Sequence, residues 1–199
     1  MDEDVLVARI RAKVAASSER PLRAPATANE IADFEAAVDL RLPQFYVRLL
    51  TEVGNGGYGP GFGIIGIPPT GYVDEDLRAG NNLAEAYLSG RRCDERAWRT
   101  PRGFLPLCNW GCGTFSHVDA LSEDAVVVTD QVSDDRLEYT ETAPSLAGWL
   151  SDWIAGVDLG GAMYEIVGYR DGVNPFTKAP LRFPLRRLRG RRVDVDGRL

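Results

Sequence analysis

The stretch EVGNGGYGPGFGIIGI, Glu52–Ile67, holds seven glycines, and its interpretation decides the fold. A glycine-rich run can be a loop that binds phosphate, or only a place where the chain turns. Phosphate loops follow a strand and precede a helix, so that the helix N-terminus faces the anion. This run instead follows a helical stripe of apolar residues spaced i, i+3, i+4 and i+7, namely Tyr46, Leu49, Leu50 and Val53.

The order of these elements predicts a turn and not a nucleotide site. Gly54 stands where a left-handed C-terminal helix cap is expected, and Gly63–Ile67 is predicted to be a strand. A Walker-type phosphate loop would also need Gly-Lys followed by Ser or Thr, which the sequence lacks. The glycine run therefore gives no reason to expect a nucleotide-binding enzyme.

Length and composition favour a cytoplasmic globular protein. The 199 residues fit one domain with additional segments, and a hydrophobic content of 44% allows a sizeable core. No apolar run approaches the roughly 20 residues that span a bilayer. The N-terminus begins with acids and has no uninterrupted apolar stretch, so no signal peptide is expected. Three cysteines, an odd number, fit a reducing compartment better than a disulfide framework.

Charge is unevenly distributed along the chain. Residues 170–199 carry nine basic residues and three acids, which leaves a net charge of −12 on residues 1–169. An acidic body repels nucleic acid and favours basic partners through long-range steering that salt weakens. The alternative is that these acids only keep the protein soluble.

Helices are predicted at five places. Residues 3–16 form an amphipathic pattern, Thr27 and Glu30 form a capping box, and Pro43 suits the first turn of a third helix. A fourth helix is predicted over residues 74–89, with Gly80 as a weak position. Ser145 caps the last one. We expect Leu49, Leu50, Trp149 and Trp153 to lie in the core.

Short strands dominate the region between the last two helices. We predict strands at Phe104–Cys108, Thr114–Asp119, Ala125–Thr129 and Leu137–Thr140, separated by turns. Such close spacing favours an antiparallel meander, because parallel crossovers need a dozen or more residues. A further strand is expected at Tyr164–Tyr169. The fold class is therefore α+β, an antiparallel sheet of about four to six strands flanked by helices.

Three segments, taken in order, resemble a known family. These are IADFEAAVDLRLPQFYVRLLTEVGNGG (31–57), FLPLCNWGCGTFSHVDA (104–120) and SLAGWLSDWIAG (145–156). Together they are similar to the SMI1/KNR4-like (SUKH) superfamily, over residues 27–157. Thr114 departs from the Asp that many members carry after the Gly-x-Gly turn. The chain then divides into an N-terminal helix and linker (1–26), the SMI1/KNR4-like domain (27–157) and an extension with a basic tail (158–199).

The resemblance implies a function as well as a fold. It implies an α+β domain with no enzymatic centre and no cofactor. Bacterial members of the superfamily are regarded as immunity proteins that neutralise toxin domains, often nucleases or deaminases. Fungal members act as regulatory interaction proteins, so a regulatory or scaffolding module is the alternative. Either role would be performed through protein partners.

Two cysteines and the only histidine could be read as a chemical site. Cys108, Cys112 and His117 would need a fourth ligand, such as Cys93 or Asp119, to bind zinc, and Cys-x3-Cys-x4-His is a weak zinc pattern. A Cys112–His117 nucleophile pair with Asp119 as orienting acid is the enzymatic alternative. Buried free cysteine is commonly only a small hydrophobe. We therefore predict neither a metal site nor a catalytic one.

Clustered acids are the candidates for binding a basic toxin. Acids gather at residues 74–76, 123–124, 134–135 and 138–141. Each cluster alone fits a solvated rim, and paired carboxylates could in principle serve a glycosidase. A nucleic-acid-directed toxin must present arginine and lysine, so an acidic inhibitor can compete by charge. The predicted partner-binding residues are Asp74, Glu75, Asp76, Asp134, Asp135 and Glu138.

The basic tail is the opposite case. Seven basic residues lie between Lys178 and Arg192. They could bind nucleic acid or an anionic surface, or neutralise the acidic body of the same chain. Base recognition is not expected, because only Phe183 is interleaved with them. We predict neither a nucleic-acid partner nor a membrane partner.

Overall fold

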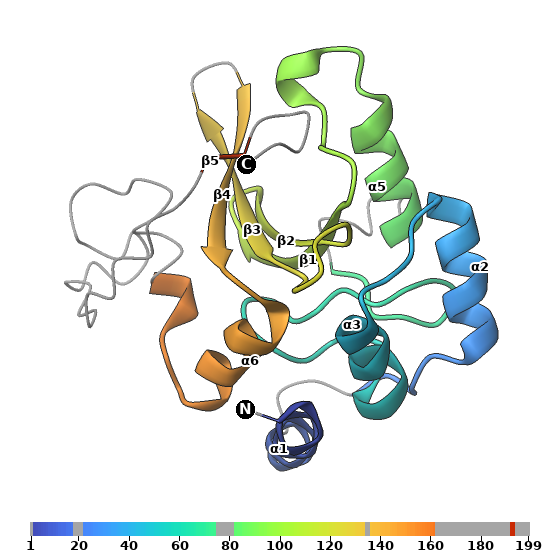
Figure 1. Ribbon diagram of the computed structural model, residues 1–199, viewed down its shortest axis with the longest axis vertical. Coiled ribbons are helices and arrows are strands. Elements are labelled where there is room, and N and C mark those ends of the chain that lie inside the picture. The colour runs from blue at the N-terminus through green and yellow to red at the C-terminus, as the bar shows by residue number, and fades with distance from the viewer. Residues whose placement is uncertain (1, 18–21, 75–81, 134–135, 162–191, 194–199) are drawn as a thin grey trace.

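The computed structural model describes residues 2–17, 22–74, 82–133, 136–161 and 192–193 (Figure 1). Its centre is an antiparallel sheet in the order β1-β2-β3-β4-β5. The first four strands form the predicted meander, and the fifth adds two residues to the edge of β4. The α+β class is confirmed. The strands are β1 (Phe104–Gly111), β2 (Thr114–Asp119), β3 (Val127–Ser133), β4 (Arg136–Ala143) and β5 (Arg192–Val193).

Helices α1, α3 and α6 lie below the sheet in Figure 1, with α2 and α5 to one side of it. The caps predicted at Thr27 and Ser145 are present, and α3 continues through a π-helical turn, Leu49–Val53. A short 3₁₀ turn, Arg96–Trp98, precedes the sheet. The helices are α1 (Glu3–Ala16), α2 (Ala28–Val38), α3 (Gln44–Arg48), α5 (Leu83–Arg92) and α6 (Leu146–Ile154).

The helix predicted over residues 74–89 is wrong in its bounds. Residues 75–81 lie outside the described part of the chain, and Asp74 is not helical. The helix α5 begins at Leu83 because Asn82 forms a capping box with Glu85. The side-chain oxygen of Asn82 accepts from the N–H groups of Ala84 and Glu85, which would otherwise be free in the first turn of the helix.

The main core lies between one face of the sheet and the helices. It includes the predicted Leu49, Leu50 and Trp149, and it also includes α1, through Leu6, Val7 and Ile10. Trp153 was expected in the core but is only half-buried. It lies at the rim, where Lys13 Nζ donates to its carbonyl at 2.8 Å and stands 4.6 Å from its ring centroid.

A smaller cluster packs on the opposite face of the sheet. Phe104, Val128 and Tyr139 are its buried members, and the ring of His117 contacts Tyr139 edge-on at 5.4 Å. Because side chains alternate along a strand, His117 faces away from Ser116 and Val118, as the sequence pattern indicated. Both faces of the sheet therefore carry buried side chains.

The glycine run follows a helix and turns, as predicted, but two of its details were wrong. Gly54 has an extended backbone (φ 166°), and the left-handed turn falls at Gly56 and Gly57. A Cβ at Gly54 would lie 2.7 Å from the carbonyl oxygen of Arg23. The strand expected at Gly63–Ile67 is reduced to a single bridge, between Ile64 and Cys108 of β1.

One buried amide holds this segment in place. The side chain of Asn55, fully buried, donates to the carbonyl of Ile67 at 3.0 Å and to Thr70 Oγ1 at 3.1 Å. It also accepts from the Ile67 N–H at 2.8 Å. The backbone carbonyl of Asn55 accepts from the Tyr72 N–H at 2.8 Å, and its N–H donates to Ala24. Asn55 therefore joins three segments of chain that are distant in sequence.

The same network reaches the start of α2. Thr70 Oγ1 donates to Glu30 Oε1 at 2.7 Å. The other carboxylate oxygen of Glu30 accepts from the N–H and hydroxyl of Thr27, at 2.7 and 2.9 Å. These hydrogen bonds to the charged form lower the pKa of Glu30, the backbone N–H of Thr27 contributing most.

We predict that Asn55→Ala destabilises the protein strongly. The change leaves the N–H and C=O of Ile67 buried without their partner, at about 1–3 kcal/mol for each group. The loss should appear as a lower midpoint in urea unfolding. Asn29→Ala, an exposed position on the first turn of α2, is the matched control and should unfold close to wild type. If Asn55→Ala lowered the urea midpoint only slightly, the hydrogen bonds of Asn55 would not be what holds this segment in place.

We also predict an acid-dependent contribution from Glu30. Because its folded pKa lies below the ordinary value of 4.5, ionised Glu30 stabilises the fold above that pH, and the contribution is lost as the pH falls through the folded pKa. Glu30→Gln should therefore flatten the fall in the free energy of unfolding below about pH 5. Glu85→Gln, at the same position of the α5 capping box, is the control. If the pH dependence of the free energy of unfolding flattens equally in Glu30→Gln and Glu85→Gln, the hydrogen bond from Thr70 to Glu30 does not contribute as described.

Candidate protein-binding groove

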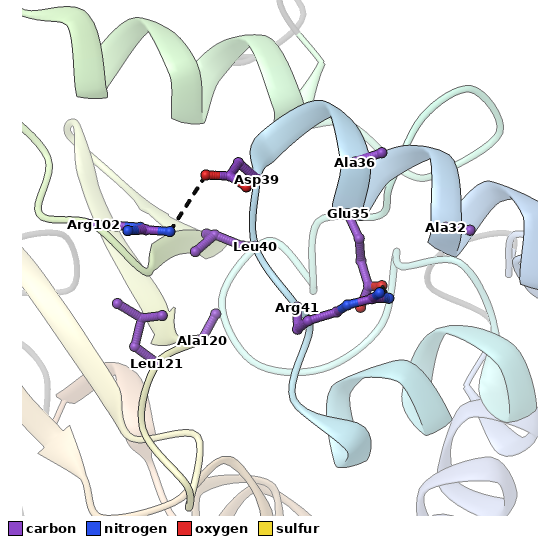
Figure 2. Close-up of a pocket in the computed structure, with 9 residues that line it drawn as sticks. All are labelled: Ala32, Glu35, Ala36, Asp39, Leu40, Arg41, Arg102, Ala120 and Leu121. Atoms are coloured by element: carbon purple, nitrogen blue, oxygen red, sulfur yellow. Dashed lines mark hydrogen bonds and ion pairs between the residues drawn. The ribbon is translucent and has the colours of Figure 1, made fainter.

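An open groove of about 510 Å³ lies between α2 and the turn that follows β2 (Figure 2). It joins two parts of the chain, residues 32–41 and 102–121, that are far apart in the sequence. We call it the α2–β2 groove. Its lining has an apolar part and a charged part, formed together by Ala32, Glu35, Ala36, Asp39, Leu40, Arg41, Arg102, Ala120 and Leu121.

The first wall is the outward side of α2. The apolar stripe of this helix points into the core, which leaves Ala32 and Ala36 on the groove side. Their short side chains leave room for another chain to approach. The helix ends at Asp39, whose left-handed backbone (φ 52°) turns the chain so that Leu40 is buried beneath the groove. The wall is thus fixed by helix packing and one special backbone conformation.

The second wall is the turn at residues 119–125. Asp119 Oδ1 accepts from the N–H of Leu121 at 3.0 Å, which shapes the turn. A Cβ at Gly103 (φ 93°) would lie 2.8 Å from Leu121 and 2.9 Å from Asp119, so only glycine allows this packing. Leu121 is left 59% exposed, more than any other large hydrophobic side chain in the described part of the chain.

Two ion pairs line the rim. Arg41 pairs with Glu35, which also accepts from the N–H of Leu42 at 2.8 Å and is mostly covered. Arg102 and Asp39 meet at 3.5 Å, with side chains 60% and 97% exposed. Exposed pairs of this kind are screened by water and worth about 0–1 kcal/mol. The Arg102–Asp39 pair can therefore open at little cost.

Acids predominate next to the exposed leucine. Glu123 and Asp124 lie exposed in the same turn as Leu121. Partial burial raises the pKa of Asp119. Hydrogen bonds from the backbone N–H groups of the turn act in the opposite direction and lower this pKa, but by less. A cation beside the exposed and adjacent Glu123 and Asp124 would be attracted to both carboxylates. The turn that carries Leu121 thus combines an exposed apolar side chain with negative charge.

The two predicted partner-binding acids that the structure describes, Asp74 and Glu138, do not line the groove. Asp74 is 2% exposed, so in this structure it offers a partner almost no surface. The side chain of Glu138 is 10% exposed and pairs with Arg136 at 2.6 Å. Glu75, Asp76, Asp134 and Asp135 lie outside the described residues. A contact between these acids and a toxin stays a prediction.

The cysteines and the histidine do not form a common site. Cys108 is buried in the main core, and burial raises the pKa of its thiol. Cys112 is exposed in the turn between β1 and β2. His117 lies on the other face of the sheet from Cys108. Among the described residues, no group of three or more His, Cys, Asp or Glu side chains is placed to hold a metal ion.

The acid partner of His117 is Asp130, and not the Asp119 that the enzymatic alternative would need. His117 Nε2 and Asp130 Oδ2 are 2.8 Å apart, and both side chains are buried. The second oxygen of Asp130 accepts from the N–H of Phe115 at 2.6 Å. Within the described structure the ring atom Nδ1 of His117 is buried without a hydrogen-bond partner, so no thiol reaches it. This arrangement braces β2 against β3.

The chain is thus an α+β domain with an antiparallel sheet and an open groove at its surface. A model of the SMI1 / KNR4 family (SUKH-1) matches residues 25–152, and the chain belongs to this family. Members are typically non-catalytic binding domains and include immunity proteins. Comparison with curated proteins gives no match. No helix in the described ranges is long and apolar enough to cross a membrane.

Sequence reasoning missed the α2–β2 groove. Its two walls come from segments that periodicity treats separately, and the stripe of α2 reports only the buried side. A partial signal was present in the sequence DALSED (119–124), where one leucine stands among three acids. The acids at residues 123–124 are evident in the sequence, but nothing in it shows that Leu121 is exposed beside a second wall.

Because Cys108 is buried and Cys112 is exposed, we predict that their thiols differ in reactivity. In the folded protein, a thiol-reactive dye should modify Cys112 first and leave Cys108 untouched, because only the exposed thiolate can react. Peptide mapping by mass spectrometry after timed labelling measures this. Cys112→Ser should remove the fastest phase and leave slower labelling of the partly exposed Cys93, and urea should expose Cys108. Labelling of Cys108 in the native protein at the rate of Cys112 would contradict the placement.

Proposed function

We propose that this domain is a bacterial immunity-type binding protein. It acts in the cytoplasm and neutralises a basic toxin domain, of the nuclease or deaminase type, by covering it. The observation that carries the proposal is the α2–β2 groove, in which an exposed leucine adjoins other apolar side chains inside a charged rim. Family membership supports a binding role and no chemistry of its own.

The groove has the composition of a protein interface. Single exposed leucines are common on protein surfaces and need no explanation. Leu121 differs because it lines one concave surface together with Leu40, Ala120 and the alanines of α2. Apolar patches rimmed by polar groups mark interaction sites, and interfaces consist of such a core with a wet, polar rim.

Charge would assist the association. The net charge of −12 on residues 1–169 attracts a basic protein over distances beyond direct contact. Such steering raises the association rate more than the affinity, and salt weakens it. The acids predicted from the sequence, including Glu75 and Asp135, can contribute to this field without touching the partner. A toxin that binds nucleic acid would be held by the cations it uses for phosphate.

One observation favours the alternative, a regulatory or scaffolding module. The immediate rim is balanced, since Arg41 and Arg102 face two acids. A balanced rim suits partners that carry both signs of charge. Such a module would bind several proteins with weaker dependence on salt. The number of partners and the effect of salt therefore separate the two functions.

The proposed function predicts one dominant basic partner. Tagged protein should capture it from the host lysate and release it only at high salt, with identification by mass spectrometry. The purified partner should then lose its nuclease or deaminase activity on addition of about one equivalent of this protein. Several partners released at low salt would support the regulatory module. Capture of a basic protein whose activity is unaffected would contradict neutralisation.

A further inference from the structure

We propose that the α2–β2 groove receives a cationic segment of the partner, with one aliphatic side chain seated against Leu40, Ala120 and Leu121. This inference rests on the proposed function and assigns the surface and the chemistry of its ligand. Two properties of the groove lead to it: the shape of its apolar part, and the arrangement of acids around Leu121.

The apolar part fits a side chain from another chain. A volume of about 510 Å³ is within the range of ligand-sized pockets, and the groove is open to solvent. Figure 2 shows Leu121 and Ala120 on one side of the space and the alanines of α2 on the other. An aliphatic side chain placed between them would cover Leu121 and lie over Leu40, which removes apolar surface from water.

The acids in the turn beside the balanced rim favour a cation. Glu123 and Asp124 are exposed in the turn that carries Leu121, next to the groove lining, and Arg102 is the cation that lines the groove on that side. Arg102 contacts Asp39 across exposed ends at 3.5 Å, so a lysine or arginine of the partner can replace it. Arg41, by contrast, is engaged with Glu35. The segment should therefore carry its cations toward the β2 turn.

Charge complementarity separates this occupant from two others. A second copy of the chain would bring the same acidic turn against an acidic body, which is repulsive. An anionic lipid surface would be repelled by the same carboxylates. A basic, partly apolar protein segment is the occupant that satisfies both halves of the groove.

A second hollow on the molecule provides an internal control. It has a volume of about 210 Å³ and lies between α1 and the glycine run, lined by Leu22, Tyr58 and Trp153 among others. Lys13 already covers the Trp153 ring there, so the site has its own cation. Leu22 is 47% exposed and thus matches Leu121 in residue type and accessibility.

The test is a titration of the isotope-labelled full chain, followed by amide NMR, with synthetic peptides. The first is a short lysine–leucine peptide whose leucines fall on one helical face. The second has the same composition with the leucines dispersed, and the third replaces lysine by glutamate. We expect shifts at residues 39–41, 102 and 119–124 with the first peptide, weaker shifts with the second and none with the third.

Variants make the assignment specific. Leu121→Ser should weaken binding of the first peptide about tenfold or more, whereas Leu22→Ser should leave it unchanged. The double change Glu123→Gln and Asp124→Asn should weaken binding and reduce its dependence on salt. All these positions are exposed, so urea midpoints should stay near wild type. Equal loss in the two leucine variants would overturn the assignment.

Different experimental results would contradict the groove as the binding site and neutralisation as the function. Shifts centred on Leu22 and Tyr58, or no shifts at millimolar peptide, would overturn the groove. The assignment would also be overturned if the Leu121→Ser variant captured the same basic partner with the same affinity as the wild type. Peptide-induced NMR shifts at the groove, together with a captured partner whose activity is not inhibited, would support the groove as the binding site and contradict neutralisation as the function.

Discussion

The buried amide of Asn55 is the interaction on which the rest of the structure depends. It occupies both its donors and its acceptor inside the protein, on Ile67 and Thr70. An amide taken out of water stabilises a fold only when its hydrogen bonds are made, so this residue tolerates one arrangement of its neighbours. That arrangement forces the glycine run to return along β1 and brings Thr70 to the start of α2.

The position of α2 follows from this network, and the groove follows from α2. The helix is held at its N-terminus by the Thr27–Glu30–Thr70 hydrogen bonds, and after its C-terminus by Glu35, which accepts from Leu42. The opposite wall is held by Asp119 and by Gly103, where no side chain fits. Both walls are thus fixed before any partner arrives. A preformed surface loses less conformational entropy on binding, which favours affinity.

Much of the fold could be predicted because its signals are local. The capping residues Thr27 and Ser145, and the close spacing of the strands, each specify structure within a few residues. The errors arose where a tertiary contact competed. Gly54 is extended because it passes the Arg23 carbonyl, the start of α5 is set by the Asn82 cap, and Trp153 lies at the rim beside Lys13. The partner of His117 was missed because Asp130 lies on the neighbouring strand.

The sequence by itself determined the family, the α+β class, the order of the elements and that the glycine run is a turn and not a phosphate-binding loop. Periodicity, caps and turn residues carry that information, since they act between residues close along the chain. Only the tertiary structure decided where a partner can bind. Arg102 and Asp39, which are 63 positions apart, meet across the α2–β2 groove, and Leu121 is exposed beside them. The physical reason is that burial and contact between distant segments are set by packing, which no local pattern encodes.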